Sequence, residues 1–169
     1  MQRIAQFEKV SFEEFQKSWR NMFLTSDEEV KNIYEEIKLP IRATAGSAGY
    51  DFFSPLDFSL SAKENILIPT GIRVKIEEGW FLGVFPKSGL GFKYRLQVDN
   101  TVGIIDSDYY YSDNQGHIFI KMTNDNNANK TLEIKKGASF CQGIFLPFGI
   151  TYSDDCKETR NGGFGSTSK

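Results

Sequence analysis

Hydrophobic residues recur at two different spacings along this chain, and the change falls near Pro40. Before Pro40 they lie three or four positions apart, which places them on one face of a helix. One such stripe contains Phe12, Phe15, Trp19, Met22 and Phe23, and a second contains Val30, Ile33 and Ile37. The spacing predicts two short amphipathic helices within residues 1–39, the second of which ends before Pro40.

Capping residues support both predicted helix starts. Ser11 is followed three positions later by Glu14, and Ser26 is followed by Glu29, which are two capping-box patterns. We expect this helix pair to pack against the rest of the chain or against a neighbouring subunit. A binding surface for another protein is the alternative.

After Pro40 the apolar runs become short and resemble strands. They read IRATA, DFFSPLDFSL, NILIPTGIRVKI, WFLGVF, YRLQVD, HIFIKM, KTLEIKKG and FCQGIFLPFGITY, separated by Gly, Pro, Asn and Asp. Many short strands without intervening helices predict an all-β sandwich, jelly roll or barrel. The polar stretch NDNNANK, residues 124–130, is predicted to be a hairpin tip.

Composition narrows the classes of function. A chain of 169 residues fits one domain, and its net charge of −2 gives no basic surface for nucleic acid. No run approaches the roughly 20 apolar residues of a membrane span, and the first ten residues lack the apolar core of a signal peptide. Cys141 and Cys156 have no CxxC spacing, so we expect free thiols and a cytoplasmic location.

The residue types also limit the chemistry that the chain can perform. His117 is the sole histidine, so zinc sites and Ser-His or Cys-His catalysis have little support. An enzyme built from this chain would work with carboxylates, backbone amides, hydroxyls, lysine and arginine.

Five stretches carry candidate chemistry, although each alone has a simpler interpretation as a turn or a satisfied strand residue. They are AGSAGYDF (45–52), PKSGLGFK (86–93), DNTVGIIDSDYYYSDNQGHI (99–118), KKGASFCQGIF (135–145) and TRNGGFGSTSK (159–169). In the third, Asp106 and Asp108 project to one face of an extended backbone. Two carboxylates so placed can polarise water or hold a hydrated cation.

The order of these stretches resembles the five-motif series of the trimeric deoxyuridine triphosphatases. The resemblance covers residues 40–169, and the earlier segment resembles extensions of some relatives from Gram-positive bacteria. It implies a distorted β jelly roll that forms a homotrimer with active sites at subunit interfaces. We therefore expect an N-terminal helical extension at 1–39, a β core at 40–155 and a flexible C-terminal lid at 156–169.

The resemblance also assigns roles on the base and sugar side of the substrate, dUTP. It implies that residues 100–109 form a hairpin that reads uracil through backbone groups, with substrate contacts at Asn100, Gly103, Ile104 and Ile105. Tyr109 would pack under the deoxyribose and leave no room for a 2′-hydroxyl. Asp106 would orient the water that attacks the α-phosphorus, which gives dUMP and pyrophosphate and limits uracil incorporation into DNA.

On the phosphate side, the resemblance implies contacts from a turn, a strand and the tail. These residues are Lys87, Ser88, Gly89 and Gln142 in the core, and Arg160, Phe164, Gly165, Ser166 and Thr167 in the lid, where Phe164 would stack on uracil. A Mg²⁺ ion would bind the triphosphate, and Asp51 would contact the ion through a water molecule.

The chain departs from the family pattern at several positions. Lys87 stands where an arginine is usual, which keeps the charge but loses the bidentate fork. The turn after Asp108 is longer than usual, and His117 receives no role. Two alternatives stay open: a dCTP deaminase-like enzyme and a nucleotide-gated regulatory protein that binds its partner through residues 1–39. The deaminase needs a glutamate beside an Arg-Ser-Ser turn, whereas this chain has Lys87-Ser88-Gly89 and Asp106.

Overall fold

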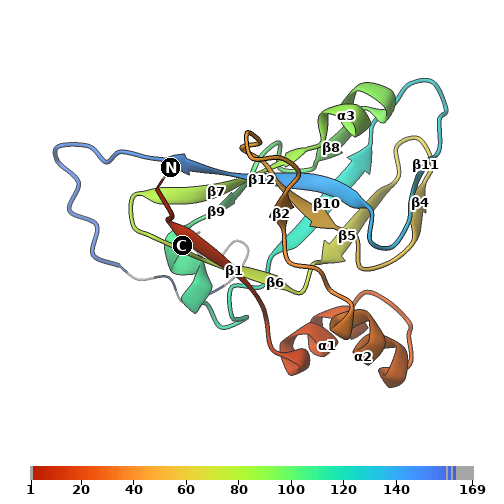
Figure 1. Cartoon of the computed structure of the whole chain (residues 1–169), viewed down its shortest axis with the longest axis horizontal. Helices are drawn as coiled ribbons and strands as arrows, with labels where there is room; N and C mark the ends of the chain where they lie inside the picture. The colour runs from red at the N-terminus through yellow and green to blue at the C-terminus, as the bar shows by residue number, and fades with distance from the viewer. Residues whose placement is uncertain (1, 159, 161, 163–169) are drawn as a thin grey trace.

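Strands form the body of the molecule, and a helix pair packs at one side of it (Figure 1). The computed structural model describes residues 2–158, 160 and 162. The helices are α1 Phe12–Arg20, α2 Asp27–Glu35, α3 Ser88–Tyr94 and the 3₁₀ helix η1 Ser107–Tyr111. The strands are β1 Ala5–Lys9, β2 Ile41–Arg42, β3 Tyr50–Phe53, β4 Phe58–Leu60, β5 Asn65–Pro69, β6 Ile72–Ile76, β7 Trp80–Pro86, β8 Leu96–Val98, β9 Gly103–Ile105, β10 Phe119–Asn124, β11 Leu132–Ile134 and β12 Ser139–Pro147.

In the part of the chain that the structure describes, the strands form four sheets whose paired members run antiparallel. The largest has the order β2-β3-β12-β7-β9, and a three-stranded sheet has the order β5-β10-β8. Two further pairs join β11 to β4 and β1 to β6. Sequence neighbours often lie in different sheets, as expected for a jelly-roll-like arrangement rather than a meander.

The core lies between these sheets and follows the alternation of the strands. In β6, for example, Ile72, Val74 and Ile76 are buried while Lys75 is exposed. Ile68, Leu82, Leu96 and Phe140 add fully buried side chains from four other segments. Period-two burial of this kind is typical of strands that turn one face to a core.

The two predicted helices are present, and their caps differ. At α2, Ser26 and Glu29 complete the capping box. At α1, Ser11 accepts a hydrogen bond from the Glu14 amide, but the Glu14 carboxylate turns away and accepts one from the Ser18 hydroxyl. Glu14 is therefore available for a contact with the core that the capping pattern did not predict.

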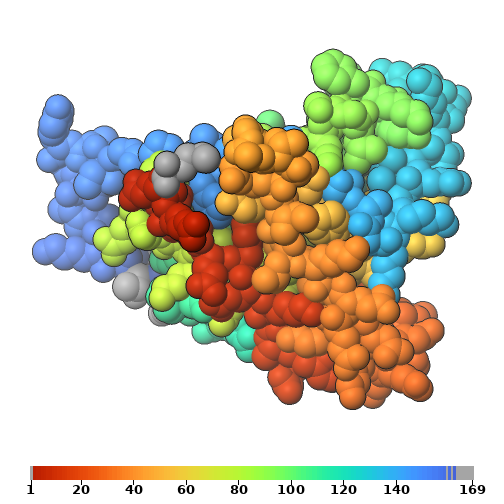
Figure 2. All heavy atoms as spheres, in the orientation of Figure 1, coloured from red at the N-terminus to blue at the C-terminus, as the bar shows by residue number. Residues whose placement is uncertain are grey.

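A second apolar cluster attaches the helix pair to the body. Its buried members are Val10, Phe15, Trp19 and Val30, and the half-buried Ile37 packs against this cluster and the main core. Figure 2 shows the segment, in red and orange, lying directly against the rest of the molecule. The extension is therefore packed on the same chain, as the first of our two expectations proposed.

Strand β1 was not predicted from the sequence. Its five residues pair with β6 along its whole length, from Ala5 opposite Ile76 to Lys9 opposite Ile72. Only Phe7 provides a large apolar side chain on this strand, and its ring packs against the rings of Tyr50, Phe52 and Phe145. One aromatic residue among polar neighbours gives no detectable period, although it is enough to fix the strand.

Two local predictions after Pro40 are wrong. Residues 124–130 do not form a hairpin tip, because β10 pairs with β5 and β8 whereas β11 pairs with β4. Asn124 and Asn126 instead hold the connection by donating to the Lys130 carbonyl oxygen. The stretch after Pro86, expected to be a turn, continues into helix α3.

Within the described residues, the helices are too short and too polar for any of them to traverse a lipid bilayer.

Candidate active site

Two carboxylates converge on one guanidinium at the end of β9. Asp106 is the N-cap of η1, and Asp108 lies in its first turn. Arg160 donates to Asp106 Oδ2 at 2.6 Å and to Asp108 Oδ1 at 3.1 Å. The two acids thus face one point, as predicted, although Asp108 lies in a 3₁₀ helix and not in extended backbone.

Tyr109 lies beside this cluster with its phenol buried. Its hydroxyl donates to the His117 carbonyl oxygen and accepts a hydrogen bond from Asn114 Nδ2, both at 2.8 Å. The Arg160 guanidinium lies 5.7 Å from the ring centroid. Burial raises the pKa of Tyr109, so the phenol stays neutral at physiological pH.

The four predicted base-side residues line one cavity of about 470 Å³. Asn100, Gly103, Ile104 and Ile105 all border it, and Met22 reaches it from the turn after α1. The predicted hairpin is wrong in its pairing, because β8 pairs with β10 while β9 pairs with β7. A turn in which Thr101 has a φ of 66° joins β8 to β9. The cavity lies between these two strands.

A second group of predicted residues meets on the large sheet. Lys87 Nζ lies 2.8 Å from Asp51 Oδ2 and donates to Ser139 Oγ at 2.7 Å. Gln142 donates to the Pro86 carbonyl oxygen at 3.0 Å, which satisfies its amide from neighbouring backbone. Strand β12 lies between β3 and β7, so three motifs that are far apart in sequence become adjacent.

Sequence reasoning missed Ser139 as a partner of Lys87. The register of β12 shifts between Ser139 and Cys141, which leaves an irregularity at this point of the strand. Such bulges re-aim side chains and cannot be read from a short apolar run. Ser88 and Gly89, the other predicted residues of this motif, are exposed in the first turn of α3.

Within one chain, the acids Asp106 and Asp108 lie near one end of β7, and the phosphate-side residues around Lys87 lie at the other end. Leu82 is opposite Ile105, so Asp106 lies beyond the Phe81 end of the strand pair. Lys87 instead follows Pro86 at the other end. Six residues of antiparallel strand span about 20 Å, so the acid and the phosphate residues of one chain do not meet.

Residues 148–158, called the C-terminal arm below, extend away from the body. Beyond β12, Figure 1 shows the chain (blue) extending from the body before it returns toward η1. Phe148, Ile150 and Tyr152 are exposed on this arm. Of the predicted lid residues, Arg160 is described, whereas Phe164, Gly165, Ser166 and Thr167 lie outside the described residues.

A metal ion would find few protein ligands here. The described residues contain no group of three or more His, Cys, Asp or Glu side chains that could hold an ion. Asp51, the predicted contact, offers one carboxylate that is paired with Lys87. This donor set suits Mg²⁺ only when the ion brings most of its ligands as phosphates and water. Both cysteines are free thiols, as predicted.

Comparisons with known proteins were consistent with the motifs. The family model described as dUTPase matches residues 35–168. The deoxyuridine 5′-triphosphate nucleotidohydrolase of Lactococcus lactis is 40% identical over 134 residues, which cover 78% of this chain and 88% of that protein. The same-named protein of Tolumonas auensis is 38% identical over 145 residues, covering 81% and 91%.

Solved structures agree with the sequence comparisons. The dUTPase from Streptococcus mutans has a TM-score of 0.62 at 32% identity, covering 86% of this chain and 97% of that one. The dUTPase from phage phi11 of S. aureus also has a TM-score of 0.62, at 21% identity, and covers 92% and 97%. The second likeness shows the fold alone. The predicted all-β, jelly-roll-like fold is confirmed.

Proposed function

The chain belongs to the dUTPase family, and from that membership we propose that it hydrolyses dUTP to dUMP and pyrophosphate. One observation carries the proposal: Asp106 directly follows Ile105, which lines the cavity between β8 and β9, and the Asp106 carbonyl oxygen accepts a hydrogen bond from the Tyr109 amide at 3.2 Å. A nucleotide bound in that cavity would have its sugar and α-phosphate near the acid. Removing dUTP in this way would limit the incorporation of uracil into DNA.

Asp106 acts on water in this proposal. Its side chain is 44% exposed, so an attacking water can reach it. The water oxygen forms a bond to the α-phosphorus while its proton passes to Asp106, and the bond to the β-phosphate oxygen breaks. Pyrophosphate leaves with that electron pair. A carboxylate is a weak base at neutral pH, so positioning of the water provides most of the acceleration.

We assign discrimination between bases to the cavity between β8 and β9, and discrimination between sugars to Tyr109. Backbone groups near Asn100 and Gly103 would hydrogen-bond uracil, and cytosine would present the reversed donor and acceptor pattern. Buried polar groups left unpaired by a wrong base discriminate strongly, whereas excluding the thymine methyl contributes about 1–3 kcal/mol. Tyr109 would contact the deoxyribose through its ring.

The phosphate side uses Lys87, Ser88, Gly89 and Gln142. Because Lys87 is paired with Asp51, a triphosphate that binds Lys87 would free that carboxylate to face Mg²⁺ through water. The ion would neutralise charge on the phosphoryl oxygens. A point variant of the phage phi11 relative is described with a structural Mg(II) ion.

We further propose a homotrimer with shared active sites. The acid and phosphate residues of one chain lie about 20 Å apart along β7, so a complete site needs the phosphate residues of a second copy. The exposed apolar side chains of the arm, Phe148, Ile150 and Tyr152, suit a contact with another subunit. We also propose a cytoplasmic location and a protein partner that binds residues 1–39.

Hydrolysis is favoured over the two alternatives. The relatives at 38–40% identity are nucleotidohydrolases, and Lys87-Ser88-Gly89 differs from the turn that a dCTP deaminase needs. A purely regulatory protein would not need Asp106 and Arg160 together.

The test is pyrophosphate release from dUTP, dCTP, dTTP and UTP in the presence of Mg²⁺, with dUTP expected to be the preferred substrate. The variant Asp106→Asn should retain dUTP binding while kcat falls by about 10²–10⁴-fold, because it loses the proton acceptor. Asp113→Asn, an exposed acid in the same segment, is the matched control and should keep its kcat. Undiminished hydrolysis by Asp106→Asn would overturn the assignment.

A further inference from the structure

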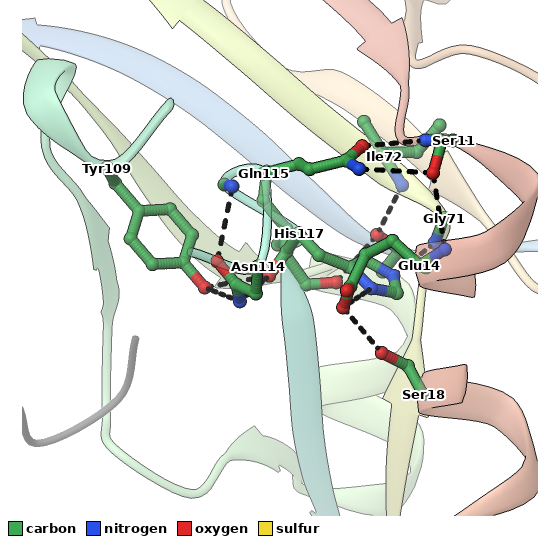
Figure 3. Close-up of polar contacts among 12 residues, drawn as sticks. Ser11, Glu14, Ser18, Gly71, Ile72, Tyr109, Asn114, Gln115 and His117 are labelled. Carbon is green, nitrogen blue, oxygen red and sulfur yellow. Dashed lines mark hydrogen bonds and ion pairs between the residues drawn. The ribbon is translucent and has the colours of Figure 1, made fainter. Parts of the chain in front are cut away.

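The loop of residues 112–117 joins Tyr109 to the N-terminal end of helix α1 (Figure 3). We propose that Asn114 in this loop is a positioning residue for Tyr109 and that it thereby sets the preference for deoxyribose over ribose. The inference rests on the proposed function, because it takes the sugar contact of Tyr109 as its starting point.

Asn114 fixes the one polar atom of the Tyr109 side chain. The phenol oxygen receives a hydrogen bond from Asn114 Nδ2 at 2.8 Å, beside its own bond to the His117 carbonyl oxygen, to which Asn114 Nδ2 also donates at 3.4 Å. Residue Tyr109 is only 5% exposed, so the position of its ring depends on how the hydroxyl end is anchored. With a donor and an acceptor both in place, the hydroxyl has a single favoured position.

The Asn114 side chain is itself fixed by the backbone of the loop. Its Oδ1 accepts a hydrogen bond from the Gly116 amide at 3.2 Å. Gly116 has a φ of 71°, and an added Cβ there would lie 2.8 Å from the Tyr109 carbonyl oxygen. The loop therefore folds back directly against the tyrosine that it anchors.

The far side of the loop is attached to the extension. Gln115 Oε1 accepts from the Ser11 amide at 2.9 Å, and its Nε2 donates to Ser11 Oγ at 3.1 Å. Both bonds lie at the N-cap of α1, where Ser11 also caps the Glu14 amide. Figure 3 shows the loop residues between the Tyr109 ring on one side and the helix residues on the other. The extension thus supports the anchor of Tyr109.

The connection between anchoring and selectivity is steric. A ring packed against C2′ excludes a ribose hydroxyl only while it stays within van der Waals contact of the sugar. An unanchored phenol could retreat by part of an ångström, which is enough to accommodate an added oxygen. The loss of one hydrogen bond to Tyr109 should therefore weaken discrimination more than it weakens dUTP hydrolysis.

The experiment compares kcat/KM for UTP with kcat/KM for dUTP. Asn114→Ala should raise this ratio by about threefold to tenfold, the range expected for one lost hydrogen bond. Asn114→Leu, which keeps the approximate size of the side chain but has no polar atom to pair with the phenol, should raise it as well. Asp113→Ala, the exposed neighbour in the same loop, should leave the ratio unchanged.

A double-mutant cycle with Tyr109→Phe separates positioning from general damage. If Asn114 acts through the phenol, Asn114→Ala should change the ratio in the parent chain and add little once the hydroxyl is gone. An equal change in both backgrounds, or no change in either Asn114 variant, would overturn the inference. Thermal unfolding of each variant shows whether the fold is retained.

The variant Tyr109→Ala distinguishes failure of the positioning role of Asn114 from failure of the proposed sugar contact of Tyr109. A raised ratio in Tyr109→Ala without one in the Asn114 variants would overturn the positioning role alone. An unchanged ratio in Tyr109→Ala would overturn the sugar contact itself, and the positioning role with it.

Discussion

His117 is fully buried between two segments that are far apart in the sequence. Its Nε2 accepts a hydrogen bond from the Gly71 amide at 2.8 Å, and its Nδ1 lies 3.7 Å from Glu14 Oε1. Burial lowers the pKa of His117 from 6.5 to about 3. The ring is therefore neutral at physiological pH and serves as a structural acceptor where the extension meets the core.

This burial makes the free energy of unfolding depend on pH. Above pH 6.5 the ring is neutral in both states; between 6.5 and about 3 only the unfolded chain binds the proton. Stability should therefore fall with decreasing pH, with a slope that approaches about 1.4 kcal/mol per unit. Urea unfolding at pH 5, 6, 7 and 8 measures this slope of the free energy of unfolding against pH.

The matched variant is His117→Gln, which keeps an acceptor for the Gly71 amide and removes the titration. It should lose most of the slope between pH 6.5 and 5. The carboxylates with lowered pKa values, such as Glu8, titrate below their ordinary value of 4.5 and so contribute at lower pH. Equal slopes in the two proteins would contradict this account.

Single residues of the candidate site were predictable where they belonged to a motif. Asp106 and Arg160 were named from sequence, and the structure places them in contact; their roles stay predictions. Asn114 and Ser139 were missed because their importance comes from partners in the fold. Ser139 is 52 positions from Lys87, and no local pattern encodes such a contact.

At the scale of elements, α1 is held by its buried aromatic face and only weakly by its own propensity, since nine residues make a marginal helix in isolation. Phe15 is completely buried in the second cluster and packs against Trp19 and Tyr34. Leu24, in the turn before α2, is fully exposed.

Phe15→Ala should therefore lower the free energy of unfolding by about 3–5 kcal/mol, through lost burial and the cavity left behind. Leu24→Ala is the control and should change it by less than about 0.5 kcal/mol. Chemical denaturation followed by tryptophan fluorescence reports both, because Trp19 lies in the same cluster. A small effect of Phe15→Ala would show that the cluster does not contribute to global stability.

Element prediction succeeded where the period was strong and failed where it was weak. The helices α1 and α2 and short strands after Pro40 were identified correctly, although Met22, Phe23 and Ile37 lie beyond the helix ends. Strand β1 has one large apolar residue, and α3 contains two glycines in seven residues, which local propensity disfavours in a helix. Both elements are therefore set by tertiary contacts, which local sequence does not contain.

At the scale of the whole molecule, the distribution of site residues predicts that activity depends on assembly and on the tail. Deleting residues 160–169 removes Arg160 and the other predicted contact residues of the lid but leaves every described helix and strand intact. Light scattering should therefore show a trimer before and after deletion, while dUTP turnover falls by about 10²-fold or more, as for lost phosphate and base contacts.

Deletion of residues 168 and 169 alone is the control, since no substrate contact is assigned to either residue. It should leave turnover close to that of the full chain. Full activity after the longer deletion would contradict the predicted role of the tail, and loss of the trimer would show that the tail contributes to assembly.

Strand β1 has a consequence for any shortened form of this protein. It is the pairing partner of β6 in a two-stranded sheet, so a chain that starts at Pro40 loses more than its helices. The hydrogen-bonding edge of β6 would be left bare beside the apolar side chains of Ile72 and Val74. Bare edges of this kind recruit strands from other molecules. Insolubility of such a chain would then reflect strand exchange between copies, and would carry no information about what the helices bind.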